Sequence, residues 1–280
     1  MFALVIALHI FFSTAMGQFY KLTTRTMKNA AAQTVGLQLV AALSCLILVP
    51  FFEWKLPSEP IVYLLLALSC VFYAINNRLL ADVRKNLDVS VVSILSQSYT
   101  ALLTVAGFVF LHEPVTIMKV VGAILIIGGN ALVFWNGKSV KKTRYIWFGL
   151  LAYACNVAAG LIDAKSSGQF NLPFYTTFLY VLPALFIFIG NRVHVSDVAD
   201  EFKRSNKRDY ILTGICWGLL YLMILIAYSM EAVSLVTPLA SLTVFSNLVV
   251  GYLWLKERDS MGKKTVAALL AILGVIFISL

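Results

Sequence analysis

Hydrophobic residues along this chain gather into ten long runs that are separated by short polar connections. Each run is about 20 residues long, the length of helix needed to cross a bilayer core of roughly 30 Å. The runs are continuously apolar and do not alternate, so they predict helices instead of barrel strands. The predicted spans cover approximately residues 2–20, 30–52, 60–83, 89–111, 115–135, 145–165, 172–190, 210–230, 233–255 and 262–280. The pattern predicts an all-α, polytopic membrane protein whose first span is retained.

One stretch of the chain occurs twice. The segment 89–113 returns as 233–257, 144 positions later, with Ser90 matching Ser234, Gly107 matching Gly251, and Glu113 matching Glu257. The same offset takes Lys21 to Lys165. We therefore expect two five-helix repeats, residues 1–137 and 138–280. Because five is odd, the second repeat would enter the membrane from the opposite side, which is the inverted topology of many secondary transporters.

Composition narrows the class of protein further. Hydrophobic residues make up 60% of the 280 positions and charged residues 12%, which leaves only short connections and no soluble catalytic domain. No phosphate-binding loop, zinc-protease motif or nucleophile elbow occurs, so an enzyme is not expected. The four cysteines lie singly in apolar runs and predict neither a metal site nor disulfides. No cofactor and no nucleic-acid partner are expected.

The net charge of +9 reflects orientation in the membrane. All of the 22 lysines and arginines except Lys55, Lys119 and Lys165 fall in connections on one side of the predicted bundle. The positive-inside rule places that side in the cytoplasm and both termini outside.

Polar residues within the spans are the candidate site, because a polar side chain facing lipid is costly. Several recur at helical spacing, so they share a face of their span. We predict that these residues bind substrate: His9, Ser13, Tyr73, Asn76, Asn77, Ser93, Gln97, Tyr153, Asn156, Trp217, Tyr221, Thr237 and Ser241. The alternative is helix packing, in which serine, threonine and glycine allow close approach.

Aromatic and acidic residues refine the mechanism. Trp217 and Tyr221 lie one turn apart and could stack on a ring or hold a cation, whereas Tyr175 and Tyr228 are expected in the interfacial belt. No acid lies clearly in the middle of a span. Exchange or facilitated movement is therefore favoured over proton-driven transport. His9 and Asp163 are the two candidates for proton coupling.

The paired motifs Phe-Leu-His-Glu-Pro (110–114) and Trp-Leu-Lys-Glu-Arg (254–258) each precede a Gly-containing closing helix, at 121–134 and 267–280. This arrangement resembles the EamA-type repeat of the drug/metabolite transporter superfamily, and Lys21 and Lys165 fit the same pattern. The resemblance implies a carrier with both termini inside, opposite to the charge rule. The chain departs from the family where His9 and Tyr153 replace a usual tryptophan. Lys21 and Lys165, with Glu113 and Glu257, are candidates for structural or gating roles.

Together these features predict a multi-pass transporter of the cell (inner) membrane. Its substrate would be a small polar or aromatic metabolite such as an amino acid, an amine or a related solute, and the bundle would be a monomer or a homodimer. The alternative is a lipid flippase or a non-transporting membrane subunit. A groove open to lipid would favour the flippase, and a central cavity lined by Asn77, Gln97, Asn156 and Trp217 would favour a soluble cargo.

Overall fold

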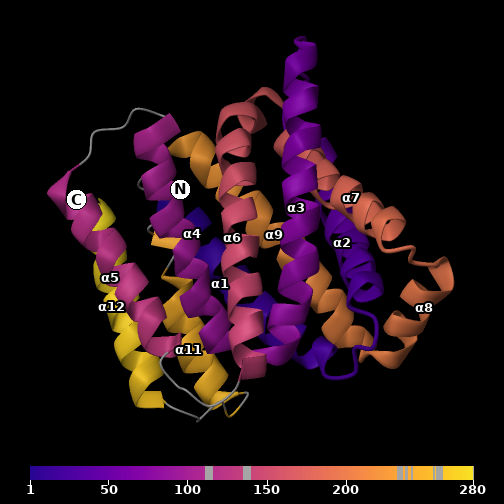
Figure 1. The fold of residues 1–280 in the computed structure, drawn as a ribbon. Coiled ribbons are helices and arrows are strands. Elements are labelled where there is room, and N and C mark those ends of the chain that lie inside the picture. The colour runs from indigo at the N-terminus through magenta and orange to yellow at the C-terminus, as the bar shows by residue number, and fades with distance from the viewer. Residues whose placement is uncertain are drawn as a thin grey trace.

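The computed structural model of the chain is a bundle of helices (Figure 1). It describes residues 1–110, 116–134, 140–231, 236, 239–240, 242–254, 256 and 261–279. Within these ranges the regular elements are helices only, as the all-α prediction requires. They are α1 (Phe2–Thr24), α2 (Ala30–Leu46), α3 (Pro60–Asn86), α4 (Val89–Phe110), α5 (Ile117–Phe134), α6 (Val140–Ser166), α7 (Leu172–Gly190), α8 (Val195–Arg204), α9 (Lys207–Met230), α11 (Thr243–Leu253) and α12 (Met261–Ser279).

Six of the described helices are long and apolar enough to cross a membrane: α1, α2, α3, α6, α7 and α9. Their positions match six of the predicted spans, and α4, α5 and α12 occupy three further ones. The predicted span 233–255 contains helical residues at 236 and 239–240 and then α11, with a turn at Leu242 just before α11 begins. There the backbone N–H of Leu242 bonds to the carbonyl of Leu239, three residues back, at 3.2 Å.

Asparagine side chains begin three of the helices. Asn29 accepts hydrogen bonds from the backbone N–H groups of the first turn of α2, Asn171 does so for α7, and Asn206 for α9. Such caps satisfy N–H groups that lack a partner inside the helix. The Asn171 amide also donates to three carbonyls between residues 49 and 53, at 3.1–3.3 Å, and so ties the start of α7 to the segment after α2.

The charged connection after α7 contains a helix that the hydropathy pattern did not predict. This helix, α8, is too short and too polar to span a bilayer, and it lies at one edge of the bundle (Figure 1). A capping box between His194 and Asp197 begins it, and the basic Lys203 and Arg204 favour its C-terminus. Its buried Glu201 accepts hydrogen bonds from the backbone N–H groups of Lys28 and Asn29, which holds α8 against the start of α2.

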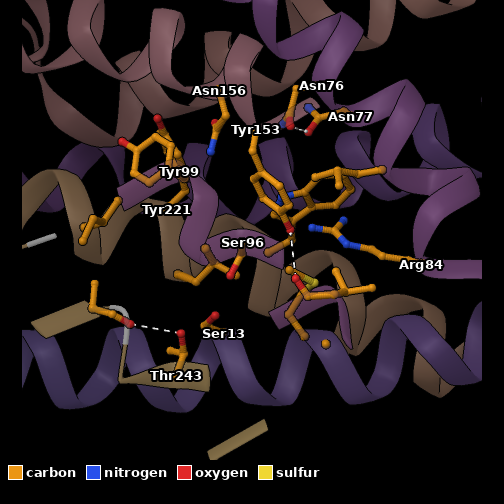
Figure 2. A pocket seen from close by; sticks show the side chains of 18 of the residues that line it. Ser13, Asn76, Asn77, Arg84, Ser96, Tyr99, Tyr153, Asn156, Tyr221 and Thr243 are labelled. Carbon is orange, nitrogen blue, oxygen red and sulfur yellow. Dashed lines mark hydrogen bonds between the residues drawn. The ribbon is translucent and has the colours of Figure 1, made fainter. Parts of the chain in front are cut away.

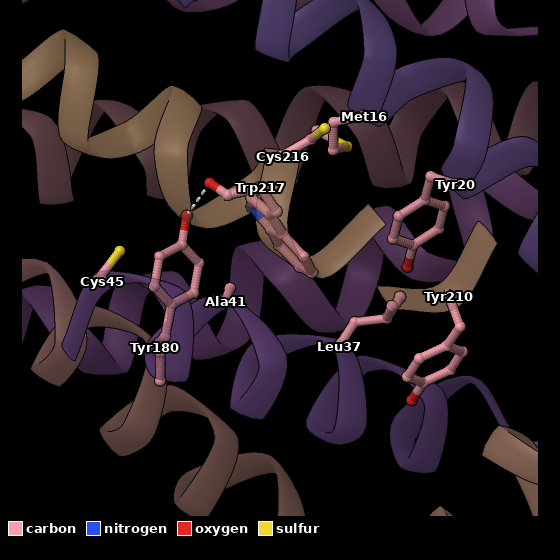
Figure 3. Close-up of a cluster of buried hydrophobic side chains, with 10 residues drawn as sticks. Met16, Tyr20, Leu37, Ala41, Cys45, Tyr180, Tyr210, Cys216 and Trp217 are labelled. Carbon is pink, nitrogen blue, oxygen red and sulfur yellow. Dashed lines mark hydrogen bonds between the residues drawn. The ribbon is translucent and has the colours of Figure 1, made fainter. Parts of the chain in front are cut away.

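Helices from distant parts of the chain pack in pairs. The pairs with the most extensive contact are α1 with α9, α3 with α6, α2 with α7, and α5 with α12, the last at the edge of the bundle opposite α8 (Figure 1). A cluster of buried aromatic and small residues joins α1, α2, α7 and α9 (Figure 3). Within it the Tyr180 hydroxyl donates to the carbonyl of Trp217 at 2.5 Å. This packing holds α9 in place, and Trp217 of the cluster also borders the cavity described next.

Candidate functional site

A cavity of about 250 Å³ lies between α1, α3, α4, α6, α7, α9 and α11 (Figure 2). Known sites for drug-sized ligands begin near 300 Å³, so this cavity suits a small metabolite. Nine of the predicted substrate-binding residues line it: His9, Ser13, Tyr73, Asn76, Asn77, Tyr153, Asn156, Trp217 and Tyr221. The polar residues predicted on α1, α3, α6 and α9 from their helical spacing thus lie around one cavity.

Four other predicted residues have no described side chain. Ser93 and Gln97 lie on α4, but their side chains are outside the described part of the structure, as are Thr237 and Ser241. The two repeated glutamates, Glu113 and Glu257, also lie outside it.

Two helices form the long walls of the cavity. The residues of α3 that line it are Tyr73, Asn76, Asn77, Leu80 and Arg84. The residues of α9 that line it are Trp217, Leu220, Tyr221, Ile224 and Tyr228. Each residue of the second set follows its counterpart in the first by 144 positions, the offset of the sequence repeat. Both sets recur at three- and four-residue steps, so each forms one stripe along its helix.

Behind these walls, Asp163 of α6 is fully buried. Its Oδ1 accepts hydrogen bonds from Ser69 and Tyr175, each at 2.7 Å, and its Oδ2 accepts them from Tyr73 and Tyr221, at 2.7 and 2.6 Å. Four donors match the acceptor capacity of an ionised carboxylate, and these lengths are typical of charge-assisted O–H···O⁻ bonds. Sequence reasoning placed Asp163 near a span end, whereas the fold encloses it with α3, α7 and α9.

The two tyrosines that reach Asp163 from the cavity walls also contact each other. Tyr73 and Tyr221 lie with their hydroxyl oxygens in close contact and their rings edge to face. Both line the cavity, so a solute that touches either phenol oxygen touches a group already bonded to Asp163. Tyr175 completes the cluster. It is 0% exposed, which corrects its expected place in the interfacial belt.

His9 is held by the backbone of α9. Its Nδ1 lies 2.8 Å from the carbonyl oxygen of Leu220, and since a carbonyl only accepts, Nδ1 donates. Nε2 is then the ring nitrogen that this bond does not use. This bond between α1 and α9 gives His9 a structural role beside its predicted binding or proton-coupling role.

The two lysines related by the repeat, Lys21 and Lys165, have different surroundings. The Nζ of Lys21 donates to the carbonyls of Arg84 and Lys85, at 3.2 and 3.3 Å, and to that of Leu87. It therefore caps the C-terminal end of α3, where a cation also favours the helix dipole. Lys165 is exposed at the end of α6.

Arg84 is the main cavity residue that sequence reasoning missed, because it was counted among the charges of a connection. The structure places it in the last turn of α3, with its side chain lining the cavity (Figure 2). Its position continues the α3 stripe by one turn beyond Leu80, and that periodicity was the available signal. Further lining residues that were not predicted as site residues are Ser96, Tyr99, Tyr180, Tyr228, Thr243 and Asn247.

The chemistry of the cavity suits binding. Hydroxyls, amides, aromatic rings and one guanidinium converge there, which is the mixture of apolar surface and a few placed polar groups that small-molecule sites use. In the ranges that the structure describes, no group of three histidine, cysteine, aspartate or glutamate side chains could hold a metal.

A bundle of apolar helices around a cavity lined by polar and aromatic side chains is typical of an integral membrane protein with an internal site for a small solute. Residues 1–135 match the sequence model of the EamA-like transporter family, so the resemblance to this branch of the drug/metabolite transporter superfamily is confirmed. No curated protein matches the chain.

Proposed function

We propose that this protein is a secondary transporter that moves a small polar or aromatic metabolite across the cell membrane by alternating access. The observation that carries the proposal is the cavity whose two long walls, α3 and α9, come from repeat-equivalent positions. A site built at the interface of two repeats is the arrangement from which alternating access follows.

The helix pairing supports two inverted repeats of five spans, at 1–137 and 138–280. Exchanging the repeats turns α1 into α6, α2 into α7, α3 into α9, α4 into α11 and α5 into α12. Under this exchange the pair α1–α9 becomes α6–α3, and α2–α9 becomes α7–α3; all four contacts occur. The pairs α2–α7, α4–α11 and α5–α12 map onto themselves, and they also occur. Two similar halves related in this way allow two similar arrangements, each open to one side.

Exchange or facilitated movement is the mode that we propose. The acid nearest to the cavity, Asp163, is fully buried and bonded to four hydroxyls, so it is not exposed to the solute directly. His9 and Asp163 remain the proposed proton partners if movement is coupled to a gradient.

Reconstitution into liposomes tests the proposal. Purified protein should take up labelled solute in exchange for unlabelled solute inside, from a panel of amino acids, amines, nucleosides and sugars. Asn156→Ala should reduce uptake of the accepted solute at least severalfold, since Asn156 lines the cavity and its amide would lose its hydrogen bonds to the solute. Trp147→Ala, on the exposed face of the same helix, is the control and should keep full uptake.

Lipid scrambling without solute uptake would instead favour the flippase. Equal solute uptake by Asn156→Ala and the control would remove Asn156 from the site.

A further inference from the structure

We propose that Arg84 binds the anionic group of the transported solute and that this group is a single carboxylate. The inference rests on the proposed transport function and adds the substrate class to it. Its starting point is a guanidinium that the fold carries into the cavity and that pairs with no carboxylate of the described residues.

Aromatic rings fix the Arg84 side chain. Its Cζ lies 4.8 Å from the ring centroid of Tyr20 and 5.4 Å from that of Trp217. Both rings are buried and stand edge to face to each other, with centroids 6.0 Å apart. Cation–π contacts of this kind orient a guanidinium and leave its N–H groups free to bind. Among the described residues, the buried Nη1 of Arg84 has no hydrogen-bond partner.

Two acids that lie on α3 or bond to it already have partners. Asp82 forms an ion pair with Arg78 at 2.8 Å, and Asp163 accepts its four hydroxyl bonds. Arg84 itself forms no ion pair within the described ranges. A partly enclosed cation in the membrane is costly unless an anion accompanies it. A solute with an acidic group would remove that cost when it binds. The cavity should therefore prefer acidic solutes to neutral ones.

The number of cations favours a carboxylate over a phosphate ester. The other lysine or arginine that lines the cavity, Lys21, donates to backbone carbonyls at the end of α3. One guanidinium offers two parallel N–H groups to a carboxylate and neutralises its single charge. A phosphate ester with two charges would have to draw Lys21 away from these backbone carbonyls to obtain a second cation. Trp217 and Tyr153 border the same space and suit the body of the solute.

The test measures binding, so that it does not depend on transport. Purified protein is titrated with sodium benzoate, with benzamide and with phenyl phosphate at equal ionic strength, and Tm is followed. These probes share one ring and differ in the group offered to Arg84. Benzoate should raise Tm, because a ligand that binds the folded state stabilises it. Benzamide should give little shift, and phenyl phosphate a smaller shift than benzoate.

Two variants of Arg84 and a matched control test whether this residue binds the carboxylate. Arg84→Gln should weaken the Kd for benzoate at least tenfold. Arg84→Lys, which keeps the charge but loses the paired N–H groups, should weaken it severalfold, and it serves alone if Arg84→Gln does not fold. Arg78→Gln removes an arginine from the same helix outside the cavity and should bind benzoate as the wild type does.

Each contrary outcome has a separate meaning. Equal shifts with benzoate and benzamide would overturn the inference, as would an unchanged benzoate Kd in both Arg84 variants. A stronger shift with phenyl phosphate would replace the carboxylate by a phosphate and also overturn it. Benzoate binding through Arg84 in a protein that moves no solute in liposomes would uphold the inference and defeat the transport proposal instead.

Discussion

The two walls of the cavity, α3 and α9, occupy equivalent places in the repeat but present different chemistry. At three of the five equivalent lining positions α3 has an amide or a guanidinium, while α9 has only aromatic and aliphatic side chains. The pairs are Tyr73 and Trp217, Asn76 and Leu220, Asn77 and Tyr221, Leu80 and Ile224, and Arg84 and Tyr228. The backbone of the repeat thus decides which positions face the solute, and the side chains decide what each wall recognises. We expect α3 to bind the polar groups of the solute and α9 to bind its apolar body.

We expect the largest loss of solute exchange from a substitution at Asp163, where the two walls of the cavity meet. Asp163 bonds to Tyr73 of α3 and to Tyr221 of α9, so it holds the two stripes in register. In Asp163→Asn the amide accepts through one oxygen only, and at least two of the hydroxyls lose their acceptor, at a cost of about 1–3 kcal/mol each. We expect solute exchange in liposomes to fall more than tenfold and Tm to drop.

The control for Asp163→Asn is Asp82→Asn, which removes a half-exposed acid that is paired with Arg78 on α3. Such surface pairs contribute little, so Tm and exchange should stay close to those of the wild type. If the two variants behave alike, Asp163 does not organise the cavity. If Asp163→Asn keeps exchange but loses uptake driven by a pH gradient, then Asp163 is a proton carrier.

A smaller effect, a loss of stability, is expected from a substitution on the face of α9 that packs against α2. Gly218 of α9 corresponds to Ala74 of α3, so one helix already has a Cβ where the other has none. A Cβ on Gly218 would lie 2.6 Å from the carbonyl oxygen of Ala41 and 2.3 Å from Ser44 Oγ, both on α2. Gly218→Ala therefore has to push α9 away from α2, and overpacking of this kind costs about 1–3 kcal/mol. Tm should fall by several degrees in a thermal unfolding assay.

Gly190→Ala gives the comparison for Gly218→Ala, because a Cβ there meets no atom within 4 Å. Its Tm should remain near that of the wild type. Equal Tm values for the two variants would show that α9 has room to move, and the close α2–α9 packing would not be a constraint on the cavity wall.

Hydropathy and helical spacing were sufficient to predict the helical bundle and nine of the residues that line the cavity. They could not predict α8, since its stability comes from a capping box and from Glu201 contacting α2, and both depend on folding. The site was predicted where polar residues lay within apolar runs, as for Asn77 and Asn156. Arg84 was missed because a charge at the end of an apolar run has the same pattern whether it faces water or a cavity. Only the packing of Tyr20 and Trp217 around its guanidinium distinguishes these cases.

The smallest effect should come from making one position of α3 resemble α9. Asn76 corresponds to Leu220, and its Nδ2 donates to Asn77 Oδ1 at 3.1 Å while its buried Oδ1 has no partner among the described residues. Asn76→Leu removes this unsatisfied acceptor, so stability should be unchanged or slightly higher. If Asn76 contacts the solute, half-saturation for a polar solute should rise about two- to threefold, or roughly 0.5 kcal/mol. Higher Tm with unchanged half-saturation would assign Asn76 to helix packing and would confine recognition on α3 to Tyr73, Asn77 and Arg84.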